Sequence, residues 1–119
     1  MTQRLVGHYL LDILEAIDGA TAAVQGQTLE SFRGSWTIRH AVQRAIEIIS
    51  EASRRIPDEM LAAHPEIPWP QIRGIGNILR HEYRHVDDTI VWRVVMQDFP
   101  PLRAAAQQIF KGLDEDPEA

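Results

Sequence analysis

A chain of 119 residues with 45% apolar and 24% charged residues has the size and composition of one soluble globular domain. No apolar run approaches the roughly 20 residues that cross a bilayer, the first residues carry no secretory signal, and the absence of cysteine excludes disulfides and thiolate metal sites. The net charge of −5 argues against binding nucleic acid through overall charge. Any RNA site must therefore be local and built from arginines. We expect a cytoplasmic protein with neither a membrane nor DNA as a partner.

Apolar residues at spacings of three and four predict a first helix over residues 2–25. The positions that form its stripe are Leu5, Val6, Tyr9, Leu10, Ile13, Leu14 and Ile17. Residues 26–34 then form a connector, in which Leu29 and Phe32 are expected to anchor onto the core.

A second helix is predicted from a cap at Ser35 or Thr37 to about Arg55. Its apolar positions are Ile38, Ala41, Val42, Ala45, Ile49 and Ala52. A polar stripe with the same periodicity runs through His40, Arg44, Glu47 and Glu51. This stripe is either a solvated face that holds an Arg44–Glu47 ion pair, or the lining of a cleft.

Residues 57–66 are expected to form a turn-like segment, with about one helical turn over 58–63. A third helix is predicted to begin near Pro70 and to extend to about His85. Its buried stripe is expected to comprise Ile72, Ile75, Ile78 and Leu79. At about 100° per residue, the opposite face gathers Arg73, Asn77, Arg80 and Arg84, with His81 and Tyr83 on its flanks. A helix with these two faces is suited to meet a phosphate.

Asp87 is expected to cap a fourth helix, which Pro100-Pro101 interrupts before a last helix over residues 102–112 that ends at a glycine. No segment alternates with a period of two, so no sheet is expected. The fold class predicted is therefore all-α: an antiparallel helical bundle of four to five helices over residues 1–113. Residues 114–119 are expected to be a disordered acidic tail.

The run His81-Glu82-Tyr83-Arg84-His85 matches the H-E-x-x-H pattern of zinc proteases, in which two histidines share one helix face. No glutamate follows at a usual downstream position for a third ligand, and Arg84 places a cation where zinc would be approached. A di-iron bundle needs Glu-x-x-His twice, whereas this chain has it once. We therefore expect no metal and no cofactor.

Cleaving RNA without a metal needs one group that moves a proton and a cation beside the developing phosphorane charge. His81 is the candidate for proton transfer, Arg73 and Arg80 are candidate phosphate clamps, and Tyr83 supplies a neighbouring hydroxyl. Candidates for further substrate contacts are Asn77, Arg84 and Arg44. The alternative is structural: Arg80 and Arg84 pair with acids such as Glu47 and Glu51, and His81 is semi-buried.

The second helix carries Ala41-Val42-Gln43-Arg44 and Glu47-Ile48-Ile49-Ser50-Glu51-Ala52. Downstream follow Ile67-Pro68-Trp69, Gly74, Asn77, His81-x-Tyr83, Val86-Asp87, Val91-Trp92 and Asp98-Phe99-Pro100-Pro101-Leu102. With this ordered set the chain resembles, over most of its length, the HepT-like (DUF86) branch of the HEPN superfamily.

The resemblance implies a homodimeric helical bundle that acts as the toxin of a toxin–antitoxin pair, with a minimal nucleotidyltransferase (MNT) as its antitoxin. In that family the pattern R-x4-H-x-Y carries a metal-independent ribonuclease activity, and the antitoxin adenylylates the tyrosine to silence it. Carried over to this chain, His81 is the catalytic histidine and Tyr83 is the AMP acceptor.

The chain departs from the family pattern at the arginine. The position five before His81 is Gly76, and wider spacings reach only Ile75 and Gly74. We expect Arg80, one turn after Gly76, to take the place of the missing arginine, with a smaller contribution from Arg73. On this view Gly76→Arg restores or raises activity. The alternative is a nucleotide- or antitoxin-binding protein with weakened chemistry.

Surplus apolar material also predicts the homodimer. The chain carries more large apolar side chains than a chain of this length buries easily, among them Trp69, Trp92, Ile90 and Phe99. We expect the third helix to border a cleft shared by both chains, where two His81 side chains converge on one substrate.

Overall fold

The computed structural model describes residues 2–82 and 87–114, and these residues are helical apart from short turns. The elements in chain order are α1 (Gln3–Val24), α2 (Leu29–Gly34), α3 (Trp36–Arg54), α4 (Asp58–Leu61), α5 (Trp69–Glu82), α6 (Asp88–Arg93), the π-helical turn η2 (Val94–Asp98) and α7 (Phe99–Asp114). This part of the chain contains no strand. The predicted all-α class is confirmed.

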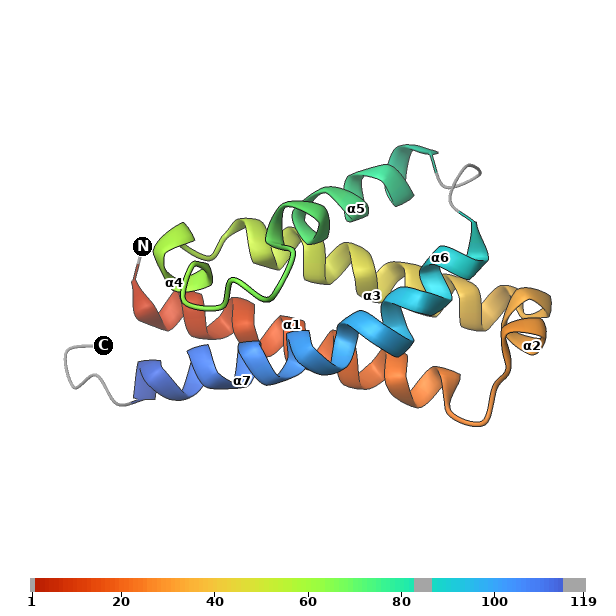
Figure 1. Cartoon of the computed structure of the whole chain (residues 1–119), viewed down its shortest axis with the longest axis horizontal. Helices are drawn as coiled ribbons and strands as arrows, with labels where there is room; N and C mark the ends of the chain where they lie inside the picture. Colours follow the sequence, from red (N-terminus) through yellow and green to blue (C-terminus); the bar gives the residue numbers. More distant parts are fainter. Residues whose placement is uncertain (1, 83–86, 115–119) are drawn as a thin grey trace.

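The long helices run side by side and antiparallel (Figure 1). α1 packs against both α3 and α7, and α5 packs on the far side of α3 from α1. The body measures 49 × 28 × 22 Å. The C-terminal end of α5 diverges from α3, as Figure 1 shows, so these two helices approach each other most closely before that end.

Two assignments of the α3 stripe are wrong. Ala41 is exposed at the edge of the groove between α1 and α3, whereas Ile46, which the stripe omitted, is buried. The buried side of α3 includes Val42, Ile46 and Ile49. Ala41 precedes Val42 by one residue, so its side chain is rotated about 100° away from that buried side. The other predicted positions of α3 are buried or packed against the core.

Side-chain caps fix where the helices begin. The hydroxyl of Ser35, and not that of Thr37, accepts from the Ile38 amide at 3.1 Å and caps α3. Asp87 caps α6 as predicted, by accepting from the Thr89 amide at 2.8 Å. That hydrogen bond to the ionised carboxylate lowers the pKa of Asp87.

The connector between the first two long helices contains a helix of its own. Thr28 and Ser31 form a reciprocal capping box that begins α2, a signal the sequence interpretation missed. Both predicted anchors face inward, with Phe32 fully buried and Leu29 half-buried. The Phe32 ring lies 5.3 Å from the ring of Trp92, so α2 is held against α6.

The prediction that Pro100-Pro101 interrupts the last helices is wrong in position. Both prolines lie in the first turn of α7, where a missing amide removes little helical bonding. The irregularity comes one turn earlier, in η2, where the Phe99 amide donates to the Val94 carbonyl. Pro100 and Pro101 have no amide hydrogen, so the carbonyls one turn before them lack their usual helical donor. The π-helical turn lies at these carbonyls. The helix also passes through Gly112 and ends at Asp114, one residue into the predicted tail; residues 115–119 lie outside the described part.

Candidate functional site

Helices α3 and α5 meet most closely at Gly76. The Ser50 hydroxyl donates to the Arg73 carbonyl at 2.8 Å and accepts from the Gly76 amide at 3.2 Å. A Cβ on residue 76 would lie 2.5 Å from the Ser50 Cβ and 3.3 Å from the Glu47 Cα. Ser50 is itself buried, so it has no room to withdraw. Glycine is required here because the backbone of α5 rests directly on α3.

This contact contradicts the expectation that Gly76→Arg restores activity, because any side chain at residue 76 must push α5 away from α3. It also explains why the predicted stripe of α5 is wrong at Ile78, which is 47% exposed. The buried side of the helix passes through Gly76 and Leu79 instead. Position 76 is therefore a packing position in this chain.

Gly76→Ala should accordingly destabilise the fold by about 1–3 kcal/mol, the usual cost of forcing extra atoms into a packed core. Gly74→Ala is the matched control, since a Cβ there meets nothing within 4 Å; it should be neutral or stabilising, because alanine favours a helix over glycine. Chemical denaturation of both variants measures the difference. Equal stabilities for the two would contradict the close packing.

Arg73 is occupied by structural contacts. Its guanidinium donates to the carbonyls of Ser53 at 3.2 Å and Ile56 at 3.1 Å, and it forms a 2.8 Å ion pair with Asp58. These carbonyls lie at the C-terminal end of α3 and just beyond it, where a helix leaves acceptors unsatisfied. Only 28% of the Arg73 side chain is exposed. The candidate clamp Arg73 thus ties α5 to the turn between α3 and α4.

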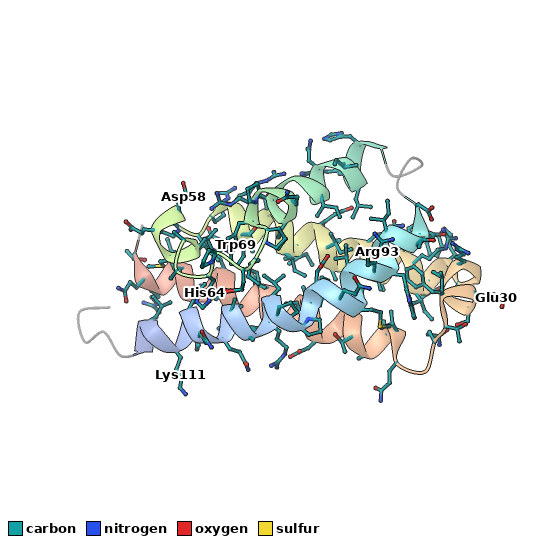
Figure 2. The ribbon with its side chains drawn as sticks, in the orientation of Figure 1. Glu30, Asp58, His64, Trp69, Arg93 and Lys111 are labelled. Atoms are coloured by element: carbon teal, nitrogen blue, oxygen red, sulfur yellow. The ribbon has the colours of Figure 1, made fainter. Side chains whose placement is uncertain are left out.

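The start of α5 is held at the same end of the molecule. The Trp69 indole donates to the His64 carbonyl at 3.1 Å, and Trp69 is buried. Figure 2 shows Trp69, the first residue of α5, beside His64, which lies in the segment that joins α4 to α5. These contacts and those of Arg73 anchor the first half of the helix that carries Arg80 and His81.

A surface cavity of about 440 Å³ opens between α1, α3 and α5. Its charged lining residues are Asp12, Arg44, Glu47, Glu51, Arg55 and Arg80. Tyr9 of α1, which the sequence placed in the core stripe, also lines it. Three residues of the predicted polar stripe of α3, Arg44, Glu47 and Glu51, therefore line a cavity, whereas His40 does not.

One cavity arginine has no carboxylate partner in the described part of the chain. Arg44 pairs with Glu47 at 3.1 Å, and Arg55 pairs with Glu51 at 3.2 Å. Within the described residues Arg80 forms no hydrogen bond or ion pair, which contradicts its predicted pairing with Glu47 or Glu51. An exposed guanidinium without a carboxylate partner is the group best placed to bind a phosphate, by donating to its oxygens.

The remaining predicted residues either do not line the cavity or fall outside the described part. His81 and Asn77 are exposed on α5 and do not line the cavity. Consecutive helical side chains point about 100° apart, so Arg80 lines the cavity while the next side chain, that of His81, points away from it into solvent. Tyr83 and Arg84 fall on residues that the structure does not describe.

Sequence interpretation missed Tyr9, Asp12 and Arg55 as cavity residues, together with the positioning residue Ser50. The i, i+3 spacing of Tyr9 and Asp12 on α1 was a local signal. No local signal could pair Ser50 with Gly76, because the contact spans 26 residues.

Within residues 2–82 and 87–114 no group of three or more histidine and carboxylate side chains is arranged to hold a metal ion. His85 of the H-E-x-x-H run lies outside these ranges. In the same ranges, no helix is long and apolar enough to span a membrane.

The family model described as ribonuclease HepT-like matches residues 13–109. A protein of Methanocaldococcus jannaschii named "Putative RNase MJ1380" is 36% identical over 103 residues, which cover 87% of this chain and 94% of the relative. A protein of Thermococcus cleftensis named "Probable ribonuclease HepT" is 37% identical over 103 residues, with the same coverage of both chains. No solved structure matches the chain at a significant level.

Proposed function

The chain belongs to the HepT-like ribonuclease family, and from that premise we propose that it cleaves RNA without a metal, through His81 and Arg80. The observation that carries this assignment of roles is the unpaired Arg80 guanidinium at the α1–α3–α5 cavity, next in sequence to the exposed His81. Arg80 supplies the cation that family members carry at position 76, which is closed to side chains here.

The chemistry divides between the two side chains. Histidine is the side chain most often used for proton transfer in catalysis, so His81 exchanges a proton with the ribose 2′-hydroxyl or with the leaving 5′-oxygen. Arg80 donates to the non-bridging oxygens as negative charge develops at phosphorus. Arg44, whose side chain is 71% exposed beside Glu47, gives the strand a second contact in the same cavity.

The test is an assay of single-stranded RNA cleavage in EDTA with the unmodified protein. Cleavage that continues in EDTA supports the proposal. Cleavage that needs an added divalent ion would overturn the metal-independent mechanism. Zinc found in the purified protein by elemental analysis would support the H-E-x-x-H interpretation in its place.

A second candidate function is binding of a nucleotide or an antitoxin with weakened chemistry. The observation in its favour is that the cavity also holds the carboxylates of Asp12, Glu47 and Glu51, which oppose a polyanion and offset its arginines. This function predicts that RNA binds and stays intact. Gel analysis of the RNA after a binding titration separates the two functions.

We further propose that the chain is the toxin of a toxin–antitoxin pair, silenced when an MNT nucleotidyltransferase adenylylates Tyr83. The support is family membership and the match of His81-x-Tyr83 to the family pattern. Incubation with such a nucleotidyltransferase and ATP should add the mass of AMP and stop cleavage. Tyr83→Phe should gain no mass and should remain active; AMP found on another residue would contradict the assignment.

The homodimer also remains a proposal. Two residues of the predicted surplus, Trp69 and Phe99, are buried within the chain, which weakens the original argument. Ile78, however, is exposed on α5 one turn before His81, so a second copy that covers this face would bring both histidines to one substrate.

Sedimentation velocity at micromolar concentration should show a dimer, and Ile78→Glu should convert it to a monomer by placing a charge in the interface. Leu11→Glu on α1 is the control, because Leu11 is exposed to the same extent, at 47%. A monomeric wild-type protein would exclude the shared cleft.

A further inference from the structure

Trp36, the first residue of α3, presents a fixed aromatic surface to solvent. The residue is 66% exposed, and its ring stacks on the ring of His40 with 4.0 Å between centroids and 28° between planes. The His40 Nδ1 lies 2.7 Å from the Trp36 carbonyl oxygen, in hydrogen-bond contact that fixes the imidazole beneath the indole. The pair is thus preorganised without help from the core.

The other two tryptophans have structural partners. Trp69 is buried and hydrogen bonded to His64, and Trp92 packs on Phe32. Trp36 differs because its outer ring face has no protein partner among the described residues. An indole that is held in one orientation and left open on one face is suited to accept a flat, unpaired ring.

The same face of α3 leads from this pair to the cavity. Trp36, His40 and Arg44 follow one another at intervals of four residues, and Glu47 and Glu51 continue the face. Arg44 lies eight positions after Trp36, a rise of about 12 Å along the helix. A strand held at Arg44 and Arg80 therefore needs to extend only a short way along α3 to reach the indole.

We propose that the Trp36–His40 pair is a stacking platform for an unpaired base of the RNA strand whose backbone occupies the α1–α3–α5 cavity. This inference rests on the proposed function, because it adds a second contact for the same substrate. Single-stranded RNA is recognised by aromatic rings that stack on splayed bases and by arginines that follow the phosphates.

The platform should favour unpaired RNA with little preference for sequence, since every base offers a flat face. A duplex hides its bases in the stack and should gain nothing from Trp36. The platform should also act on binding and leave the chemical step alone. On a long RNA, Trp36→Ala should raise KM and leave kcat unchanged, whereas a change at His81 lowers kcat.

The test measures binding in a background that does not cut. His81→Ala and the double variant Trp36→Ala/His81→Ala are titrated into a fluorescein-labelled single-stranded oligouridine, with anisotropy as the readout. Trp36→Ala should weaken binding by roughly 5- to 150-fold, the range for loss of one base–aromatic stack. Trp36→Phe keeps a ring and should retain most of the affinity. Met96→Ala, a change at another exposed apolar side chain, should leave affinity unchanged.

Equal affinities for the parent and the Trp36→Ala variant would overturn the platform, as would a parent that binds no oligouridine. A Trp36→Ala variant that sediments as a monomer from a dimeric parent, with unchanged RNA affinity, would assign the face to a protein interface and also overturn it. The two proposals fail separately. If the wild-type protein binds RNA through Trp36 but never cleaves it, the platform stands and the ribonuclease proposal fails. If it cleaves RNA but binds it equally well without Trp36, the ribonuclease proposal stands and the platform fails.

Discussion

His81→Ala is expected to lower the rate of RNA cleavage by about 10²–10⁴-fold, the usual contribution of a positioned general acid or base. His81 is exposed near the end of α5 and contributes nothing to the buried core, so the variant should fold normally. Single-turnover cleavage in EDTA measures the first expectation, and thermal unfolding measures the second.

His8→Ala provides the matched control. His8 is an exposed histidine on α1, away from the cavity lining, and its removal should leave the rate unchanged. A folded His81→Ala protein that cleaves at the wild-type rate would remove His81 from the mechanism. A variant that loses stability and keeps its activity per folded molecule would assign His81 a structural role.

Arg80→Ala is expected to lower cleavage by about 10²–10³-fold, as for other single groups that stabilise transition-state charge. The reason is that Arg80 is the cavity arginine without a carboxylate partner in the described part of the chain. Stability should change little, because a surface arginine without a partner supports no other group. Single-turnover rates and denaturation curves for the same preparation measure both effects.

Arg73→Ala should show the opposite pattern. Loss of this guanidinium leaves the Ile56 carbonyl without its donor, removes one of the donors to the Ser53 carbonyl and breaks the pair with Asp58, so stability should fall by about 1–3 kcal/mol. Activity per folded molecule should stay close to that of the wild type. Arg55→Ala, in the cavity but paired with Glu51, should change the rate only slightly. Cleavage that persists in both Arg80→Ala and Arg73→Ala would rule out the replacement of the family arginine by Arg80.

The sequence predicted the long helices because their signals are local. The 3–4 periodicity located α1 and α3 to within about two residues at each end, and the caps at Ser35 and Asp87 follow from side chains that bond amides two or three residues on. The π-turn before Pro100 was missed because a proline pair was interpreted as a break in the helix. The chain instead places both prolines where a new helix begins.

The site was less predictable because it depends on contacts between distant residues. The 3–4 spacing of apolar residues predicted that Ile78 is buried. The close approach of Gly76 to Ser50 instead turns a different side of α5 toward α3. The sequence alone does not distinguish Arg73 from Arg80, because both are arginines on the same helix, seven positions apart. Only the carbonyls at the end of α3 distinguish the structural arginine from the available one.

The Arg80→Ala/His81→Ala double variant tests most directly the central claim that these two side chains form one catalytic site. Residues that act on the same step are strongly non-additive, so the double variant should cleave RNA in EDTA about as slowly as the slower single variant. A rate reduced by the product of the two single effects would mean that the residues act independently. Wild-type cleavage by either folded single variant would contradict the claim outright.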